Sequence, residues 1–157
     1  MISEMAMDTA LKSRLHARCL DVVEERIATL RQREKEVQTA ANSETKSSAG
    51  DKYETGRAMM QLDRERLAGQ MEEAAKLKKA LDQVALGEVS KEVVFGRLVI
   101  TSGPGYFIAA SLGEVALDEN KYFVISASAP IAGQLMGKQV GETIQLAGRS
   151  LSINEIH

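Results

Sequence analysis

Apolar residues recur at alternating steps of three and four along the first part of the chain, at Leu20, Val23, Ile27, Leu30, Val37 and Ala41. Glu34 occupies the one polar slot in this series, and no Gly or Pro occurs between Leu11 and Lys46. Such a seam is typical of a helix that packs along another helix. The pattern predicts a helix over about Leu11–Lys46, roughly 50 Å long at about 1.5 Å per residue.

A second seam of similar length follows, at Met60, Leu67, Met71, Ala74, Leu81 and Val84. It predicts a helix over about Asp51–Leu86, in which Gly56 and Gly69 each cost up to about 1 kcal/mol. The nine residues 42–50 between the seams are small or polar, apart from one Glu and one Lys. Because a short link joins antiparallel neighbours, we expect a helical hairpin. A long parallel dimer is the alternative, and the break between two equal seams argues against it.

The second part of the chain has the pattern of a small sheet domain. Strands are expected over 93–101, 106–111 and 122–126, a short helix over 130–136, and a closing hairpin over 142–146 and 150–156. Pro130 is well placed for the first turn of that helix. We therefore predict an α+β protein with a helical hairpin in residues 1–86 and a sheet domain in 87–157.

Charge supports this division and excludes one class of function. The first 86 residues carry 15 Lys/Arg and 15 Asp/Glu, whereas the remainder carries 5 and 7, which gives the chain a net charge of −2. Neither half has the basic excess that simple electrostatic binding of free nucleic acid requires.

Few residues have the side chains and the spacing of a catalytic or metal-binding site. The single cysteine, Cys19, allows no internal disulfide and lies in a helical pattern, so we expect a partly buried, unreactive thiol. His16 and His157 are far from any Ser/His/Asp set or zinc spacing and are expected to be solvated. No apolar run could span a membrane, and Glu4 and Asp8 interrupt any signal-peptide profile. We expect a soluble cytoplasmic protein.

Two acids at the expected tip of the hairpin stand out, because carboxylates there would contribute little to the core. Asp51 and Glu54 are three residues apart, which also fits a capping box at the start of a helix. Tyr53 lies between them and is the only aromatic residue in the first 86, so we expect it to contact a partner. Two carboxylates are an incomplete set for Mg²⁺, which takes six oxygen ligands. They would suffice if a partner supplied the rest.

In these features the chain resembles, over its whole length, the bacterial Gre-type transcript cleavage factors of RNA polymerase. The tip motif of that family, a Gly-Asp pair with a Glu three residues after the Asp, appears here at Gly50–Glu54 as Gly-Asp-Lys-Tyr-Glu. A second signature of the family, which includes a Gly-Lys pair, is matched by Pro130–Glu142. The resemblance implies a coiled-coil hairpin followed by an FKBP-like α+β domain, and it implies an accessory factor and not an enzyme.

The resemblance also implies a mode of action. The hairpin would enter the polymerase secondary channel, where Asp51 and Glu54 would help to hold a Mg²⁺ shared with the polymerase, which cleaves backtracked RNA near its 3′ end. Lys52 and Tyr53 at the tip, and Ser128, Ala129 and Pro130 in the second domain, would contact the polymerase. A monomer is expected, because the two helices of the hairpin bury their apolar seams against each other within one chain.

Two elements differ from the family pattern. After the tip Glu, the usual Asn-Ala-Glu-Tyr is replaced by Thr55–Ala58, and the acidic Asp-Ser-Pro element is replaced by Ser128–Pro130. Two alternatives therefore stay open: a channel-binding regulator that does not stimulate cleavage, and a coiled-coil chaperone or assembly protein. Prolyl isomerisation is not expected, because that pocket is lined by aromatic residues and the chain has no Trp.

Overall fold

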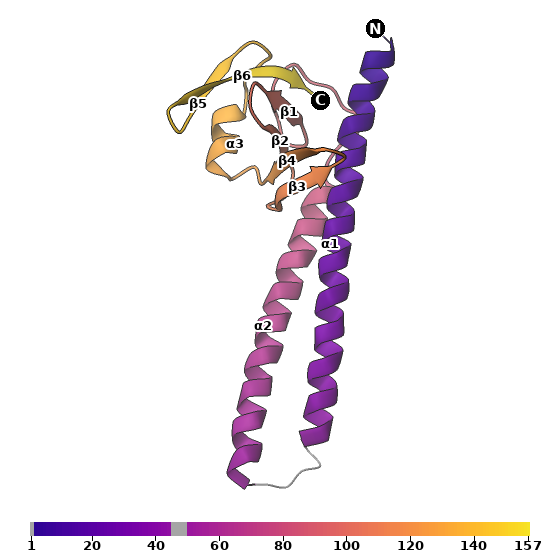
Figure 1. Cartoon of the computed structure of the whole chain (residues 1–157), viewed down its shortest axis with the longest axis vertical. Helices are drawn as coiled ribbons and strands as arrows, with labels where there is room; N and C mark the ends of the chain where they lie inside the picture. The colour runs from indigo at the N-terminus through magenta and orange to yellow at the C-terminus, as the bar shows by residue number, and fades with distance from the viewer. Residues whose placement is uncertain (1, 45–49) are drawn as a thin grey trace. The chain divides into compact units, whose positions relative to one another are not determined.

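A computed structural model describes the backbone of residues 2–44 and 50–157, and the side chains of residues 10–42 and 54–157. The order of elements is α1 (Ile2–Glu44), α2 (Gly50–Asp82), β1 (Leu98–Thr101), β2 (Gly105–Ile108), β3 (Gly113–Leu117), β4 (Asn120–Ile125), α3 (Pro130–Leu135), β5 (Thr143–Leu146) and β6 (Arg149–Ile156) (Figure 1). The chain forms two compact units, Val22–Lys76 and the combination of Met1–Asp21 with Leu77–His157.

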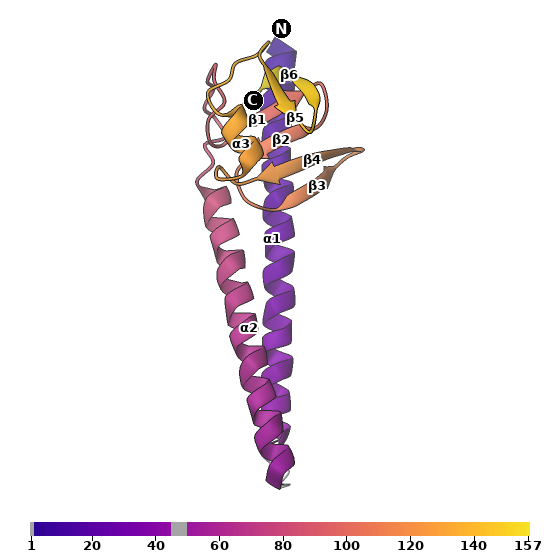
Figure 2. The same ribbon diagram turned by 90° about the vertical axis from the view of Figure 1, so that its left-hand side faces the viewer.

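The first unit contains residues 22–44 of α1 and 50–76 of α2, which lie side by side in Figures 1 and 2. The seam positions expected from the sequence are those that the helices cover: Val23, Ile27, Leu30, Leu67 and Ala74 are buried, and Val37, Ala41, Met60 and Met71 are partly buried. An interhelical hydrogen bond, from Arg64 to Gln38, joins the two helices within one chain. The predicted antiparallel hairpin is therefore confirmed.

The second unit contains a six-stranded mixed sheet with the order β3-β4-β2-β1-β6-β5. The neighbouring strands are antiparallel except for β2 and β4, which run parallel. The chain places β4 between β2 and β3, so that the β3–β4 hairpin extends one edge, and β5 forms the other edge. This arrangement confirms the predicted α+β class.

α3 covers one face of the sheet. Its buried residues Ala132 and Leu135 join a hydrophobic cluster formed with Val93, Val99, Tyr106, Ile108, Ile144, Leu151 and Ile153. The opposite face of the central strands is also buried, since the paired residues Leu98 and Phe107 are fully covered. Burial on both faces explains why β1 and β2 read as continuous apolar runs in the sequence.

The structure differs from the sequence-based elements at several points. α1 begins at Ile2, well before Leu11, and α2 ends at Asp82, before Leu86. β1 begins only at Leu98, because Gly96 takes a φ of 87° that interrupts the expected strand over 93–101. β3 was not anticipated, since it is a short edge strand with a single buried residue, Val115. The proposed boundary at residue 86 stays a prediction.

Candidate functional site

The tip acids lie in the first turn of α2, which begins at Gly50. Positions 51 and 54 are three residues apart in one helix and therefore share a side of it. The side chains of Asp51, Lys52 and Tyr53 lie outside the described residues, so their roles stay predictions. The arrangement of the backbone places both acidic positions next to the chain reversal of the hairpin.

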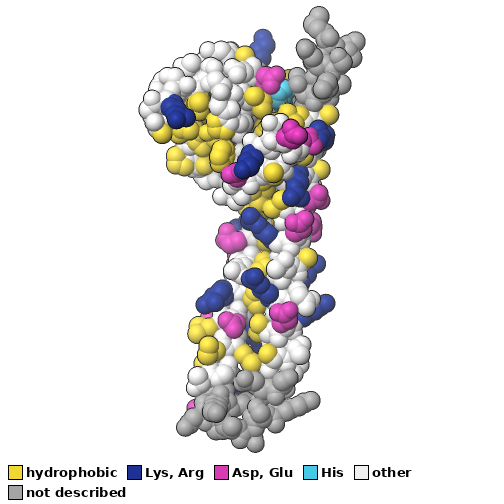
Figure 3. Space-filling model, in the orientation of Figure 1, with side chains coloured by type: hydrophobic (Ala, Val, Ile, Leu, Met, Phe, Trp, Pro, Cys, Tyr) yellow, Lys and Arg dark blue, Asp and Glu magenta, His cyan; other side chains and the backbone are white. Residues whose placement is uncertain are grey.

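Glu54 is the first residue of α2 whose side chain is described, and it is exposed. Arg57, one turn further along the helix, is exposed as well. On the face of the hairpin that Figure 3 shows, charges of both signs are interspersed among the described side chains, with no large region of one sign. A carboxylate at position 54 is thus accessible to a ligand or a partner, but a cation lies within reach of it along the helix.

The predicted docking residues form the turn that leads into α3. Ala129 donates its backbone N–H to Ser126 O at 3.1 Å, and the hydroxyls of Ser126 and Ser128 lie 3.0 Å apart. Pro130 then opens the helix with a backbone already suited to its first turn. Ser128 and Pro130 are exposed and Ala129 is half-buried. This turn presents a small polar surface that a partner could contact.

Two glycines of the second signature, Gly137 and Gly141, have structural roles. Gly137, with a φ of 80°, follows the end of α3 and donates its N–H to Val93 O at 2.9 Å, while Val93 N–H donates to Lys138 O at 2.9 Å. Gly141 has a φ of 95° and donates to Ile153 O at 2.8 Å. Positive φ angles favour glycine, so the backbone turns alone can account for these positions.

A cluster of buried cations in the second unit was missed by the sequence analysis. Lys12 is only 2% exposed and places its Nζ 3.4 Å from Glu88 O. Arg97 is 3% exposed; its Nε donates to Ser90 Oγ at 2.9 Å, and its guanidinium lies 3.8 Å from the Glu88 carboxylate. Burial and then the charge of Arg97 lower the pKa of Lys12 below its ordinary 10.5, while Glu88 acts in the opposite direction. The helical spacing of α1 gave no sign of this burial.

His16 corrects one expectation and Cys19 confirms another. His16 is buried, and its Nε2–H donates to Leu81 O at 2.7 Å, so it is not a solvated side chain. The carbonyl that it satisfies belongs to the last turn of α2, which explains why a polar group is tolerated there. Cys19 is fully buried, and burial raises the pKa of its thiol to about 12. The thiol is therefore unreactive in the folded protein.

Among the side chains that the structure describes, no group of three or more His, Cys, Asp or Glu residues could hold a metal ion. None of the described helices combines the length and the apolar character needed to cross a membrane.

No family model matches the chain, and no curated protein sequence matches it. The solved structures with partial similarity include two proteins of one kind. GreA factor homolog 1 (Gfh1) of Thermus thermophilus is 18% identical with a TM-score of 0.35, and the match covers 87% of this chain and 93% of that protein. Gfh1 of Thermus aquaticus is 13% identical with a TM-score of 0.35, covering 90% and 95%. These values assign the chain to no family.

Proposed function

We propose that this protein is an accessory transcription elongation factor that binds bacterial RNA polymerase and stimulates the cleavage of backtracked RNA. The observation that carries the proposal is the position of Asp51 and Glu54, one helical turn apart beside the chain reversal of an antiparallel hairpin. Carboxylates at these positions would contribute little to the apolar core of the hairpin. They are suited to an active site that another protein completes.

The chemistry of the donor set fits Mg²⁺ in a shared site. Asp51 and Glu54 supply oxygen ligands of the kind that Mg²⁺ prefers, and the polymerase would supply the remainder. Held by Asp51 and Glu54 together with the polymerase, Mg²⁺ would supply activation of a water and stabilisation of the charge that develops on the phosphate. The residues of this chain hold and orient the ion near the RNA 3′ end, and the chain has no nuclease activity alone.

The turn Ser126–Pro130, in which Ser128 and Pro130 are exposed, supports a second contact with the polymerase. Ser128, Ala129 and Pro130 would dock on the enzyme while Lys52 and Tyr53 contact it at the tip. The hairpin buries its own seam within one chain, which supports a monomer in solution.

The test is RNA cleavage by purified polymerase in stalled, backtracked elongation complexes. We expect the variant that combines Asp51→Ala and Glu54→Ala to reduce stimulated cleavage by about tenfold to a hundredfold, as loss of groups that support a metal site typically does. Binding to polymerase, measured in parallel by co-sedimentation, should be retained. A matched control removes the exposed acids Asp63 and Glu65 of the same helix, by the same substitutions, and should leave cleavage unchanged. Unchanged cleavage in the tip variant refutes the proposal.

One observation favours a second candidate, a regulator that occupies the channel without stimulating cleavage. Arg57 is exposed one turn after Glu54, at a position where the family pattern has an acid. An i,i+3 ion pair would compete with a metal for the Glu54 carboxylate. In that case the wild-type protein binds polymerase without effect on cleavage, and Arg57→Glu introduces stimulation.

A further inference from the structure

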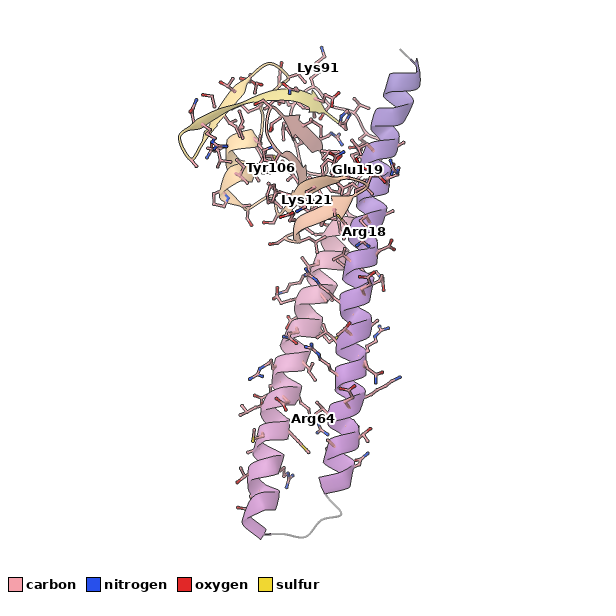
Figure 4. The ribbon with its side chains drawn as sticks, viewed as in Figure 1. Arg18, Arg64, Lys91, Tyr106, Glu119 and Lys121 are labelled. Carbon is pink, nitrogen blue, oxygen red and sulfur yellow. The ribbon has the colours of Figure 1, made fainter. Side chains whose placement is uncertain are left out.

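The seam of the hairpin contains a polar layer. In α1 the slot between Leu30 and Val37 is occupied by Glu34, and in α2 the slot between Met60 and Leu67 is occupied by Arg64. Both side chains are exposed, although their positions in the repeat face the partner helix. Arg64 lies between the two helices in Figure 4 and donates to Gln38 Oε1 at 2.9 Å.

A hollow of about 510 Å³ accompanies the layer. Its lining combines the polar side chains Glu34, Gln38 and Arg64 with the apolar side chains Val37, Leu67, Ala68 and Met71. At this layer the two seams therefore border a partly open hollow instead of a closed, packed layer. Loss of close packing removes both dispersion contacts and apolar burial from the helix pair.

Burial changes across this layer within the unit Val22–Lys76. On one side five of the six seam residues, Val23, Ile27, Leu30, Leu67 and Ala74, are no more than 8% exposed, and the sixth, Met71, is partly buried. On the other side Val37, Ala41 and Met60 are only partly buried, and no described seam residue between the layer and the tip is fully covered. Helical stability in proteins comes mainly from such packing. The two sides of the layer therefore differ in what holds them together.

We propose that the Glu34–Gln38–Arg64 layer divides the hairpin into two cooperative segments. The segment between the layer and the tip, described for residues 35–42 and 54–63, opens while the segment formed by residues 22–30 and 67–76 stays packed. Segments with few buried apolar contacts open at lower free energy than the fully packed core. The inference rests on packing alone and does not depend on the proposed function.

Native-state hydrogen exchange of the full chain, read by mass spectrometry on peptides, tests the proposal. We expect backbone amides in residues 35–42 and 56–63 to exchange on the order of tenfold or more faster than those in 22–30 and 67–76. The change should occur at the layer and should not be a gradual increase along each helix. Equal protection on both sides of the layer overturns the proposal.

A variant that fills the seam identifies the cause. Combining Glu34→Leu with Arg64→Leu restores two apolar slots, and we expect exchange in the tip segment to slow by on the order of tenfold. Glu36→Leu with Arg66→Leu is the matched control, because both residues are exposed and lie outside the seam and the lining of the hollow. An unchanged rate in the seam variant, or equal slowing in the control, assigns the effect to helix propensity or fraying and overturns the proposal.

Discussion

Lys12 is a buried lysine whose replacement by an apolar residue should change the free energy of unfolding. Its side chain is 2% exposed, its Nζ has a hydrogen bond of 3.4 Å to Glu88 O, and the Arg97 guanidinium is a second cation close by. Removing a charge from water costs several kcal/mol unless the charge is well paired. We predict that Lys12→Met stabilises the protein.

The magnitude follows from opposing effects. A hydrogen bond near the length limit is worth at most about 1 kcal/mol, and Glu88 is an exposed residue whose carbonyl can bind water instead. Methionine has nearly the same length as lysine, so packing changes by less than about 1.5 kcal/mol. Relief of desolvation and of repulsion from Arg97 outweighs these losses and the lost attraction to the Glu88 carboxylate, because the pKa of Lys12 is lowered on balance. We expect a net gain of about 1 to 2 kcal/mol in the free energy of unfolding near neutral pH.

The pH dependence provides a second, independent check. Because the pKa of Lys12 is lowered in the folded state, the unfolded state binds more protons between the folded pKa and 10.5. The wild-type protein therefore gains stability as the pH rises through that window, and the advantage of Lys12→Met shrinks. Other groups that titrate there, such as Tyr106, contribute to both proteins and cancel in the difference.

Urea denaturation followed by circular dichroism, at about pH 7 and about pH 10, measures both quantities. Lys35→Met, at an exposed position of the same helix, is the control and should change stability by no more than about 0.5 kcal/mol. The reasoning is refuted if Lys12→Met destabilises the protein by about 1 kcal/mol or more near neutral pH, or if its advantage does not fall with rising pH.

Three further predictions follow from burial and packing. Leu67→Ala should cost about 2 to 4 kcal/mol by urea denaturation, whereas Leu62→Ala, at a residue that is 60% exposed in the same helix, should cost less than about 1 kcal/mol; similar losses would contradict the seam. Gly105→Ala would place a Cβ 2.8 Å from the Tyr122 ring, so we expect about 1 to 3 kcal/mol of destabilisation, and a neutral result would show that the ring moves freely. Burial raises the pKa of Cys19 from 9.0 to about 12, so stability should decrease as the pH rises from 9.0 towards 12, because only the unfolded thiol ionises. At neutral pH, rapid labelling of Cys19 by a disulfide reagent in the folded protein would contradict this burial.

The helical hairpin was predictable because its stabilising pattern is local. Seam residues three and four apart define a helix face without any knowledge of its partner, and Leu30 and Leu67 are buried where the repeat places them. The same pattern showed Glu34 as an exception. It did not show that Arg64 of the other helix hydrogen-bonds to Gln38, one turn after Glu34, because the register between the two helices is a property of the folded pair.

The sheet was less predictable, and the reasons differ from strand to strand. Central strands with both faces buried appear in the sequence as apolar runs, as Val99 and Phe107 illustrate. The edge strand β3 offers one buried residue, Val115, and therefore no usable periodicity. The parallel pairing of β2 with β4 also escaped prediction, since strand order is not encoded in a period.

For the candidate site, the residue types were readable from the sequence, and the structure added the position of these residues in the helix. Asp51 and Glu54 were identified from spacing and from a resemblance, and the structure adds that both positions lie in the first turn of α2. The structure also showed that Gly137 and Gly141 have backbone roles, which the motif alone did not reveal.

By itself, the sequence determined the two helices, the point at which the chain reverses and the acids next to it, because each depends on neighbours a few residues apart. Only the tertiary structure decided the strand order, the hollow beside Arg64, and the burial of Lys12 and Arg97 around Glu88. Those features join residues that are distant in the chain, such as Lys12 and Glu88. Their energies depend on how much water the folded protein excludes, which no local pattern records.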